Sequence, residues 1–128
     1  NKKPQSCRYM GVDLREDNFI GLRSTENNVF CMEENSSNID NIMKVCNDSG
    51  ITKFSILFID GLHSINQVMA DCRFMQHVEV GGYVLFHDTN WHPGPHCVFD
   101  ALDEEMFEKT RTSVEDLDWG VGVAKRIK

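Results

Sequence analysis

The sequence predicts an α/β fold: a Rossmann-like, doubly wound and mostly parallel sheet with an antiparallel C-terminal edge pair of strands. Three observations predict it. Short apolar runs alternate with stretches of helical period, as they do in βαβ units. The run Phe54 to Ile59 is almost continuously apolar, which is typical of a parallel strand covered on both faces. Two further strand-like runs lie close together near the carboxyl terminus.

Length and composition limit the class of protein. The 128 residues, of which 41% are hydrophobic, are enough for a single domain, residues 1–128, with a buried core. The formal net charge of -7 repels phosphate backbones and anionic lipids, so we expect no nucleic-acid and no membrane partner. The longest apolar run is far too short to cross a bilayer. The 5 cysteines include no C-x-x-C pair, so we expect a cytoplasmic protein without a disulfide framework.

The first half of the chain is expected to hold two strands and two helices. Its elements are a strand over Arg8–Asp13, one weak helix within Asp17–Asn28, a strand over Val29–Met32 that ends in Glu33 and Glu34, and a helix with apolar positions Ile39, Ile42, Met43 and Cys46. Gly50 is expected to end this last helix, because glycine accepts the left-handed conformation there.

The second half continues the alternation. Its expected elements are the strand Phe54–Ile59, a helix over Ser64–Val78, a turn at Gly81 and Gly82, a strand over Tyr83–Phe86, a helix over Val98–Lys109, and strands around Thr112–Glu115 and Gly120–Ile127. The segment Pro93-Gly94-Pro95 is expected to separate the second of these helices from the strand before it. The last two strands are expected to form the antiparallel edge pair.

Two aspartates follow the best strands of the chain. Asp60 comes directly after the strand Phe54–Ile59, and Asp88 follows the strand that ends near His87. In an open parallel sheet the carboxyl ends of neighbouring strands open into one crevice. Because neighbouring strands lie only about 4.8 Å apart, both carboxylates can reach one ion if the two strands are neighbours. Such oxygen ligands suit Mg²⁺, Ca²⁺ or Mn²⁺. The alternative is that each aspartate only caps the turn after its strand.

Four of the five histidines are expected at this crevice, where they can act as a base or as metal ligands: His63, His87, His92 and His96. For His63 a helix-capping role competes with ligand contact, and His77 is expected on the surface of a helix. Trp91 either walls a pocket or packs against its neighbours. The acidic residues Asp100, Asp103, Glu104, Glu105 and Glu108 are interpreted as one solvated helix face.

These residues together resemble a known family. The residues on which the resemblance rests are Phe58-Ile59-Asp60-Gly61-x-His63-Ser64, Val68, Asp71, Gly81-Gly82, the segment His87-Asp88-Thr89 and the terminal Gly120-Val121-Gly122-Val123. They resemble the later half of class I S-adenosylmethionine-dependent methyltransferases, in the branch whose fourth strand ends in I-D-G-x-H and whose fifth ends in H-D.

The resemblance implies roles for individual residues. Asp13 would bind the cofactor's ribose, and Glu34, with Glu33 as its rival, would contact the adenine. Asp60, Asp88 and Asn90 would hold a divalent cation such as Mg²⁺, which assists O-methylation of a small hydroxylated acceptor. Asp60, His63 and His87 are the candidate catalytic residues, and Asp60 is also a candidate contact of the cofactor.

The family's first strand and its glycine-rich loop have no counterpart in this sequence. The chain therefore resembles a family member truncated at its amino terminus, and we expect that a homodimer can form through the strand edges left unpaired. Two alternatives stay open. One is a non-catalytic remnant of the fold that acts by association. The other is a metal-dependent hydrolase or oxygenase built on Asp60, His63, His87 and Asp88.

Overall fold

The computed structural model of this chain describes residues 7–19, 28–112 and 119–128. The chain divides into two compact units, Asn1–Thr52 and Lys53–Lys128, which we call the first and the second unit. The described residues form an α/β fold with parallel strand pairs in both units and antiparallel strands near the carboxyl terminus, which confirms the predicted fold class. No described helix is long and apolar enough to cross a membrane.

The first unit contains two parallel strands. Strand β1 (Tyr9–Asp13) pairs with β2 (Val29–Glu33), so that Asp13 lies opposite Glu33. A 3-10 helix η1 (Glu16–Phe19) follows β1, where the sequence predicts a longer helix whose remaining positions, 20–27, lie outside the described residues. The predicted strands are confirmed to within one residue at each end.

Helix α1 (Ile39–Asp48) follows β2 and buries the four apolar residues that predicted it: Ile39, Ile42, Met43 and Cys46. It ends as expected, because Gly50 adopts a φ of 76° and its carbonyl accepts a 2.7 Å hydrogen bond from Nη1 of Arg8. A Cβ at this position would lie 2.2 Å from the same Nη1. The backbone conformation therefore favours glycine here, and a larger residue would also displace the Arg8 side chain from this contact.

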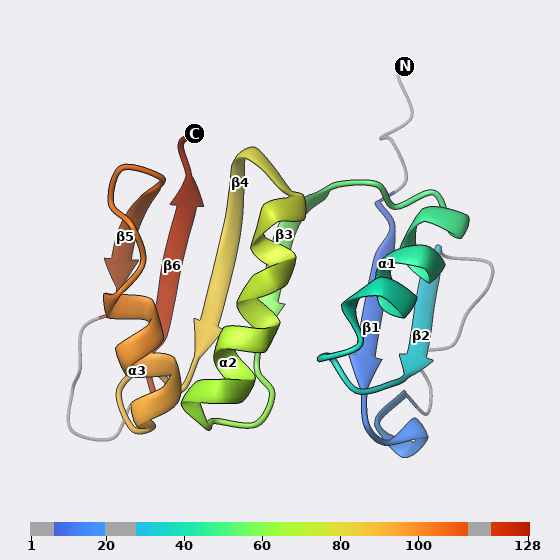
Figure 1. Cartoon of the computed structure of the whole chain (residues 1–128), viewed down its shortest axis with the longest axis horizontal. Helices are drawn as coiled ribbons and strands as arrows, with labels where there is room; N and C mark the ends of the chain where they lie inside the picture. Colours follow the sequence, from blue (N-terminus) through green and yellow to red (C-terminus); the bar gives the residue numbers. More distant parts are fainter. Residues whose placement is uncertain (1–6, 20–27, 113–118) are drawn as a thin grey trace. The chain divides into compact units, whose positions relative to one another are not determined.

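The second unit contains a four-stranded sheet in the order β3-β4-β6-β5. The strands are β3 (Phe54–Ile59), β4 (Val78–His87), β5 (Phe107–Arg111) and β6 (Val121–Arg126), and the helices are α2 (Ile65–Cys72), η3 (Arg73–His77) and α3 (Pro93–Asp100). Strands β3 and β4 are parallel, whereas β6 runs antiparallel to both of its neighbours. The antiparallel edge pair is thus confirmed, with its inner strand β6 where it was expected, but its outer strand β5 lies at Phe107–Arg111 and not around Thr112–Glu115 (Figure 1).

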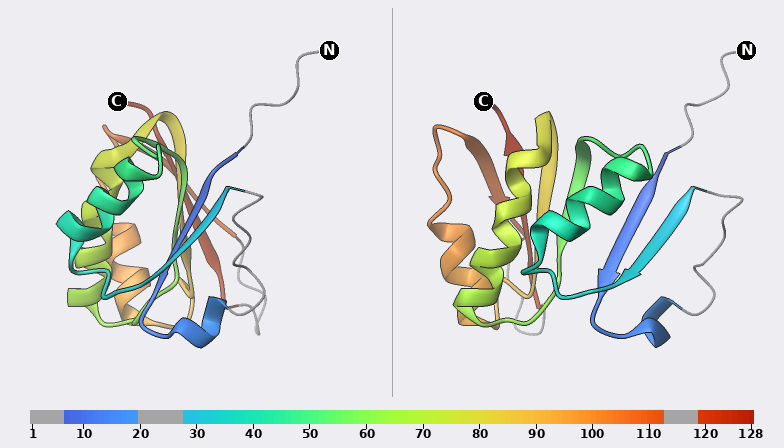
Figure 2. Two further views of the ribbon diagram at one scale, coloured as in Figure 1. Left: turned by 90° about the vertical axis from the view of Figure 1, so that its right-hand side faces the viewer. Right: turned by 45° about the vertical axis from the view of Figure 1, so that its right-hand side comes forward.

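Helices α2 and α3 of the second unit lie on the same face of its sheet (Figure 1, Figure 2). Val68 of α2 and Phe99 of α3 pack into one core with Val84, Phe86 and Ala124 of the strands. The opposite face carries apolar side chains that stay exposed in the described chain, among them Ile56 (64% exposed) and Phe58 (55%). The expectation that both faces of β3 are covered is therefore wrong.

The structure corrects the sequence-based assignment between Pro93 and Arg111. The expected helix Val98–Lys109 begins earlier, at Pro93, and ends at Asp100. Proline fits this first turn because the missing N–H has no partner within the helix in any case. After the helix, Oδ1 of Asp103 accepts a hydrogen bond from the N–H of Glu105, and the chain turns into β5. The acidic residues beyond Asp100 therefore do not form a helix face.

Two further boundaries differ from expectation. Strand β4 begins at Val78 and passes through Gly81 (φ 88°) and Gly82, where the sequence predicts a turn and a shorter strand. Phe54 pairs with Val78 whereas Ile56 pairs with Tyr83, so β4 carries extra residues over this interval, at the amino-terminal end of β3. Positions 113–118, which include most of the expected strand at Thr112–Glu115, lie outside the described residues.

All five cysteines are free, as expected, but only Cys46 is buried. Burial raises the pKa of the Cys72 thiol to about 12, and it also raises the pKa of Cys46. Neither thiol is an activated nucleophile, because the reactive species is the thiolate.

Candidate functional site

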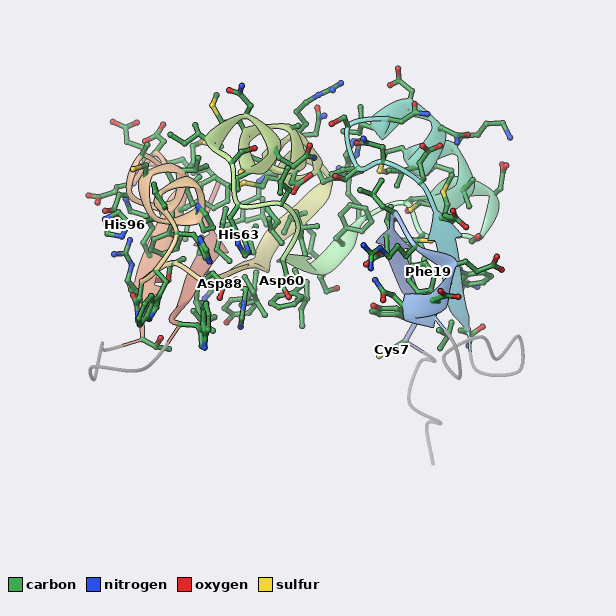
Figure 3. All side chains as sticks on the ribbon, turned by 90° about the horizontal axis from the view of Figure 1, so that it is seen from below. Cys7, Phe19, Asp60, His63, Asp88 and His96 are labelled. Atoms are coloured by element: carbon green, nitrogen blue, oxygen red, sulfur yellow. The ribbon has the colours of Figure 1, made fainter. Side chains whose placement is uncertain are left out.

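The two predicted aspartates lie side by side. Strands β3 and β4 are parallel neighbours, and Ile59 pairs with Phe86, so Asp60 and Asp88 emerge from adjacent strands at the same end of the sheet. Figure 3 shows Asp60, His63 and Asp88 gathered at this end of the second unit. Because the carboxyl ends of parallel strands open into one crevice, the loops that follow can bring further side chains to the same point.

Asp88 is the centre of the site. Its side chain is only 7% exposed, and its two carboxylate oxygens have different partners. Oδ2 lies 2.7 Å from Nε2 of His63, whereas Oδ1 lies 2.9 Å from Nδ1 of His87. Burial of an ionised carboxylate is costly unless charged or hydrogen-bonding groups compensate it, which the histidines and a cation can do.

The backbone of Asp88 adopts the left-handed conformation, with φ of 60°. This region is uncommon for residues other than glycine, although aspartate and asparagine are enriched there. The conformation reverses the chain at the end of β4, and the carbonyl of Asp88 accepts hydrogen bonds from the N–H groups of Trp91 (3.3 Å) and His92 (3.1 Å). The turn thereby holds His92 next to the carboxylate of Asp88.

Asp60 and His87 complete the first group of possible ligands. Nδ1 of His87 lies 3.2 Å from Oδ1 of Asp60 and 2.9 Å from Oδ1 of Asp88, so the imidazole stands between the two carboxylates. Nδ1 of His87 and Oδ1 of Asp88 are buried, yet they lack the alignment of a hydrogen bond. Possible ligand atoms of Asp60, His87 and Asp88 all lie within 4.8 Å of one another.

This first group fits a divalent cation. Two carboxylates supply the hard oxygen ligands that Mg²⁺ and Mn²⁺ prefer, and the imidazole supplies one nitrogen. A cation would also give a partner to the two buried polar atoms that face each other without a hydrogen bond. Asp60, with a side chain 44% exposed, leaves the group accessible from solvent.

The crevice contains a second group, whose members the sequence placed at the crevice without predicting that they come together. The rings of His63 and His92 stack with their centroids 4.1 Å apart, and possible ligand atoms of His63, Asp88 and His92 lie within 4.8 Å of one another. The ring of His92 also stacks with Trp119, with centroids 6.2 Å apart, and the ring of Trp91 lies 5.6 Å from that of Trp119. Trp91 therefore packs against another aromatic side chain beside the site, which is the second of the two interpretations of this residue.

The remaining predicted residues of the second unit lie around these groups. His63 does not cap helix α2, because the hydroxyl of Ser64 accepts the hydrogen bond from the N–H of Gln67. The side chain of Asn90 packs against Gly120, where an added Cβ would lie 2.2 Å from its Cγ. His96 contacts the carbonyl of Thr89 and the carboxylate of Asp100 and belongs to neither ligand group.

His77 lies in η3, away from the two groups, as expected. Its ring makes an edge contact with Phe54 at 6.2 Å. Its pKa is lowered, first by burial and then by the charge of Lys53.

The predicted cofactor ligands outside the crevice belong to the first unit. Asp13 ends β1, and hydrogen bonds from Asn18 and from the backbone of Arg15 lower the pKa of its carboxyl. Glu34 follows β2, and its carboxylate accepts hydrogen bonds from Asn41 (2.8 Å), Asn38 and the N–H of Asn35, the first of which lowers its pKa most. Both groups are thus ionised hydrogen-bond acceptors at the carboxyl ends of adjacent strands.

No protein-family model and no curated protein matches this sequence, whereas solved structures share its fold. An rRNA methylase from Streptococcus thermophilus matches with a TM-score of 0.68 at 12% identity, covering 94% of this chain and 74% of that one. SMU.1697c from Streptococcus mutans, solved in complex with SAH, matches with a TM-score of 0.62 at 11% identity, covering 94% of this chain and 72% of that one.

The methyltransferase MycE of the mycinamycin biosynthetic pathway, solved with Mg, SAH and mycinamycin VI, also matches. Its TM-score is 0.64 at 13% identity, and the match covers 94% of this chain but only 37% of MycE. The described chain therefore has the fold of S-adenosylmethionine-dependent methyltransferases of class I, and it spans between about a third and three quarters of these neighbours.

Proposed function

We propose that this chain is an S-adenosylmethionine-dependent methyltransferase domain that transfers a methyl group to a hydroxyl of a small acceptor with the help of a divalent cation. The observation that carries the proposal is the convergence of Asp60, His87 and Asp88 at the carboxyl ends of two adjacent strands, in a chain with a methyltransferase fold. The neighbour MycE, solved with Mg and SAH, supports the pairing of this fold with a cation.

The proposed cation ligands are Asp60 and Asp88, with His87 as the added nitrogen ligand and Asn90 as the residue that the family resemblance contributes. When bound, the cation lowers the pKa of the acceptor hydroxyl and S-adenosylmethionine supplies the methyl group. The partial exposure of Asp60 leaves the acceptor a way to this position. The acidic net charge of -7 favours a small acceptor over a nucleic acid.

His63 is the proposed proton acceptor. Its Nε2 lies 2.7 Å from Oδ2 of the buried Asp88, so an N–H donated there leaves Nδ1 with the lone pair. The acceptor oxygen then forms a bond to the methyl carbon as the carbon–sulfur bond breaks, and the hydroxyl proton moves to Nδ1 of His63. The carboxylate of Asp88 stabilises the imidazolium that results.

Asp13 and Glu34 are the proposed ligands of the cofactor's ribose and adenine. An ionised carboxylate accepts hydrogen bonds from ribose hydroxyls, each worth about 1.5–3 kcal/mol when one partner is charged. The carboxylate of Asp13 accepts hydrogen bonds from Asn18 and from the N–H of Arg15 (2.9 Å to Oδ1), and its two oxygens still have lone pairs for a hydroxyl. The carboxylate of Glu34 is shared with three donors of its own loop and helix, so Glu33 stays its rival.

Titration calorimetry with S-adenosylmethionine and SAH tests the proposal, on the polypeptide as its gene encodes it. We expect binding, which Asp13→Asn weakens by roughly tenfold or more, the equivalent of about 1.4 kcal/mol. The matched control is Asp17→Asn, on the exposed first turn of η1, which should leave the affinity unchanged. Absence of binding to the unsubstituted protein would refute the enzyme assignment.

A non-catalytic remnant is the second candidate function. It is favoured by the carboxylate of Glu34, which already accepts hydrogen bonds from its own loop and helix. Strand β3 is an end strand of the four-stranded sheet within the second unit, and an end strand of this kind can pair with a second copy, as in a homodimer. Cofactor binding in the calorimetric experiment would exclude the remnant, and sedimentation equilibrium measures the oligomeric state.

A further inference from the structure

The carboxylate of Asp88 faces two different sets of neighbours. Its Oδ1 lies toward His87 and Asp60, whereas its Oδ2 lies toward His63. A single cation on the Asp60 side accounts for only one of these oxygens. The other oxygen lies 2.7 Å from Nε2 of His63, beside which the ring of His92 is stacked.

A hydrogen bond between His63 and Asp88 explains the position of His63 but not that of His92. His92 precedes the first turn of α3, where a side chain often caps the free N–H groups, yet its imidazole makes no such hydrogen bond. Its backbone is instead held by the carbonyl of Asp88 at 3.1 Å. The left-handed turn at Asp88 thus brings a second imidazole within 4.8 Å of the other two ligand atoms.

The two groups differ in chemistry. Asp60, His87 and Asp88 offer two oxygens and one nitrogen, whereas His63, His92 and Asp88 offer two nitrogens and one oxygen. Imidazole ligands favour Zn²⁺, Fe²⁺, Co²⁺ and Ni²⁺, and carboxylates favour Mg²⁺, Ca²⁺ and Mn²⁺. One bridging carboxylate between two cations about 3.5–4 Å apart is a recurring arrangement in two-metal sites.

We propose that Asp88 is a bridging ligand, and that His63 and His92 form with it a second cation site, selective for borderline transition metals of the zinc and cobalt kind. This site shares Asp88 with the oxygen-rich site at Asp60 but has its own ligands in His63 and His92, and it does not depend on methyl transfer. A cation bound there occupies Nε2 of His63, so the same imidazole cannot form the hydrogen bond to Asp88 that the proposed proton acceptor needs. Occupancy by zinc would therefore inhibit a magnesium-assisted reaction.

Visible absorption of Co²⁺ tests the second site directly, because the ligand-field bands report the coordinating nitrogens without any enzymatic assay. The full chain is titrated with Co²⁺ in the presence of saturating Mg²⁺, which fills the oxygen-rich site. We expect one Co²⁺ to bind, and His92→Phe, which keeps an aromatic ring for stacking, to weaken this binding by about tenfold or more. His77→Phe is the matched control, because His77 lies outside both groups, and it should change nothing.

The oxygen-rich site is tested separately with Asp60→Asn, which should weaken Mg²⁺ binding and leave the Co²⁺ spectrum in place. Equal Co²⁺ affinity in His92→Phe, equal loss in His77→Phe, or complete displacement of Co²⁺ by Mg²⁺ would each overturn the proposal. Thermal unfolding verifies that each variant is folded, and His92→Gln replaces His92→Phe if the latter is not. Failure to bind S-adenosylmethionine refutes the proposed function alone, because no arm of this titration contains the cofactor.

Discussion

Substitution of Asp88 by alanine and by glycine separates the backbone of this residue from its carboxylate. Both variants lose the carboxylate and its contacts with His63 and His87, so these losses cancel when the two are compared. What remains is the effect of a Cβ at a φ of 60°. In most folded positions alanine is the more stable of the two residues, by about 0.4–1 kcal/mol, because glycine gives the unfolded chain more freedom.

At Asp88 the order should be reversed. The left-handed conformation costs a residue with a Cβ roughly 1–2 kcal/mol, whereas glycine adopts it freely. Subtracting the unfolded-state advantage of alanine leaves Asp88→Gly more stable than Asp88→Ala by about 0.8 kcal/mol. With a urea m value of about 1.5 kcal/mol/M, the midpoint of unfolding should differ by about 0.5 M.

Urea unfolding followed by circular dichroism measures this difference at neutral pH. Asp88→Asn serves as a third variant, because asparagine also tolerates the left-handed region and preserves the size of the side chain. It should be at least as stable as the alanine variant. An alanine variant that equals or exceeds the glycine variant in stability would show that the turn at Asp88 relaxes to an ordinary conformation, and the argument that this turn positions His92 would fail.

Two further predictions concern stability. The hydrogen bonds from Asn41 and from the backbone of Asn35 lower the pKa of Glu34 below its ordinary value of 4.5, so ionised Glu34 stabilises the fold above that pH, and this contribution is lost as the pH falls through the lowered pKa. In thermal unfolding, Glu34→Ala should therefore lose the most stability, relative to the unsubstituted protein, near pH 7. A loss of stability that stays the same in acid would contradict this. The second of these predictions compares two phenylalanines on opposite faces of the same sheet: Phe86 is fully buried, and Phe58 is 55% exposed. In urea unfolding, Phe86→Ala should reduce the free energy of unfolding by about 3–5 kcal/mol and Phe58→Ala by less than about 1 kcal/mol. Similar losses in the two variants would show that the face of Phe58 is covered.

The positions of Asp60 and Asp88 could be predicted because the signal is short in range. Each follows a run of apolar residues that must be a strand, and parallel strands end at a common edge. The placement of His87 between both carboxylates follows from the same reasoning, since it is the last residue of β4. The sequence was sufficient here because strand geometry fixes the direction of the chain.

The pairing of His63 with His92 was beyond such reasoning. It depends on the backbone reversal at Asp88, and left-handed aspartates are too uncommon to be assumed from the residue type alone. The start of α3 at Pro93 did have a signal, because proline favours the first helical position, but the Pro-Gly-Pro segment also matches a loop. Strand β5 had no such signal, because Phe107 is its only apolar residue and its other half-buried positions are Lys109 and Arg111.

The uneven pairing of β3 with β4 has a consequence for variation in sequence length. The extra residues of β4 lie between Val78 and Tyr83, at the far end of the ladder from the two aspartates. A deletion or insertion within residues 79–81, which are exposed, leaves the spacing from Tyr83 to Asp88 intact. A single residue inserted after Tyr83 would instead turn His87 toward the core and Phe86 toward solvent. Tolerance to indels should therefore change abruptly along this one strand.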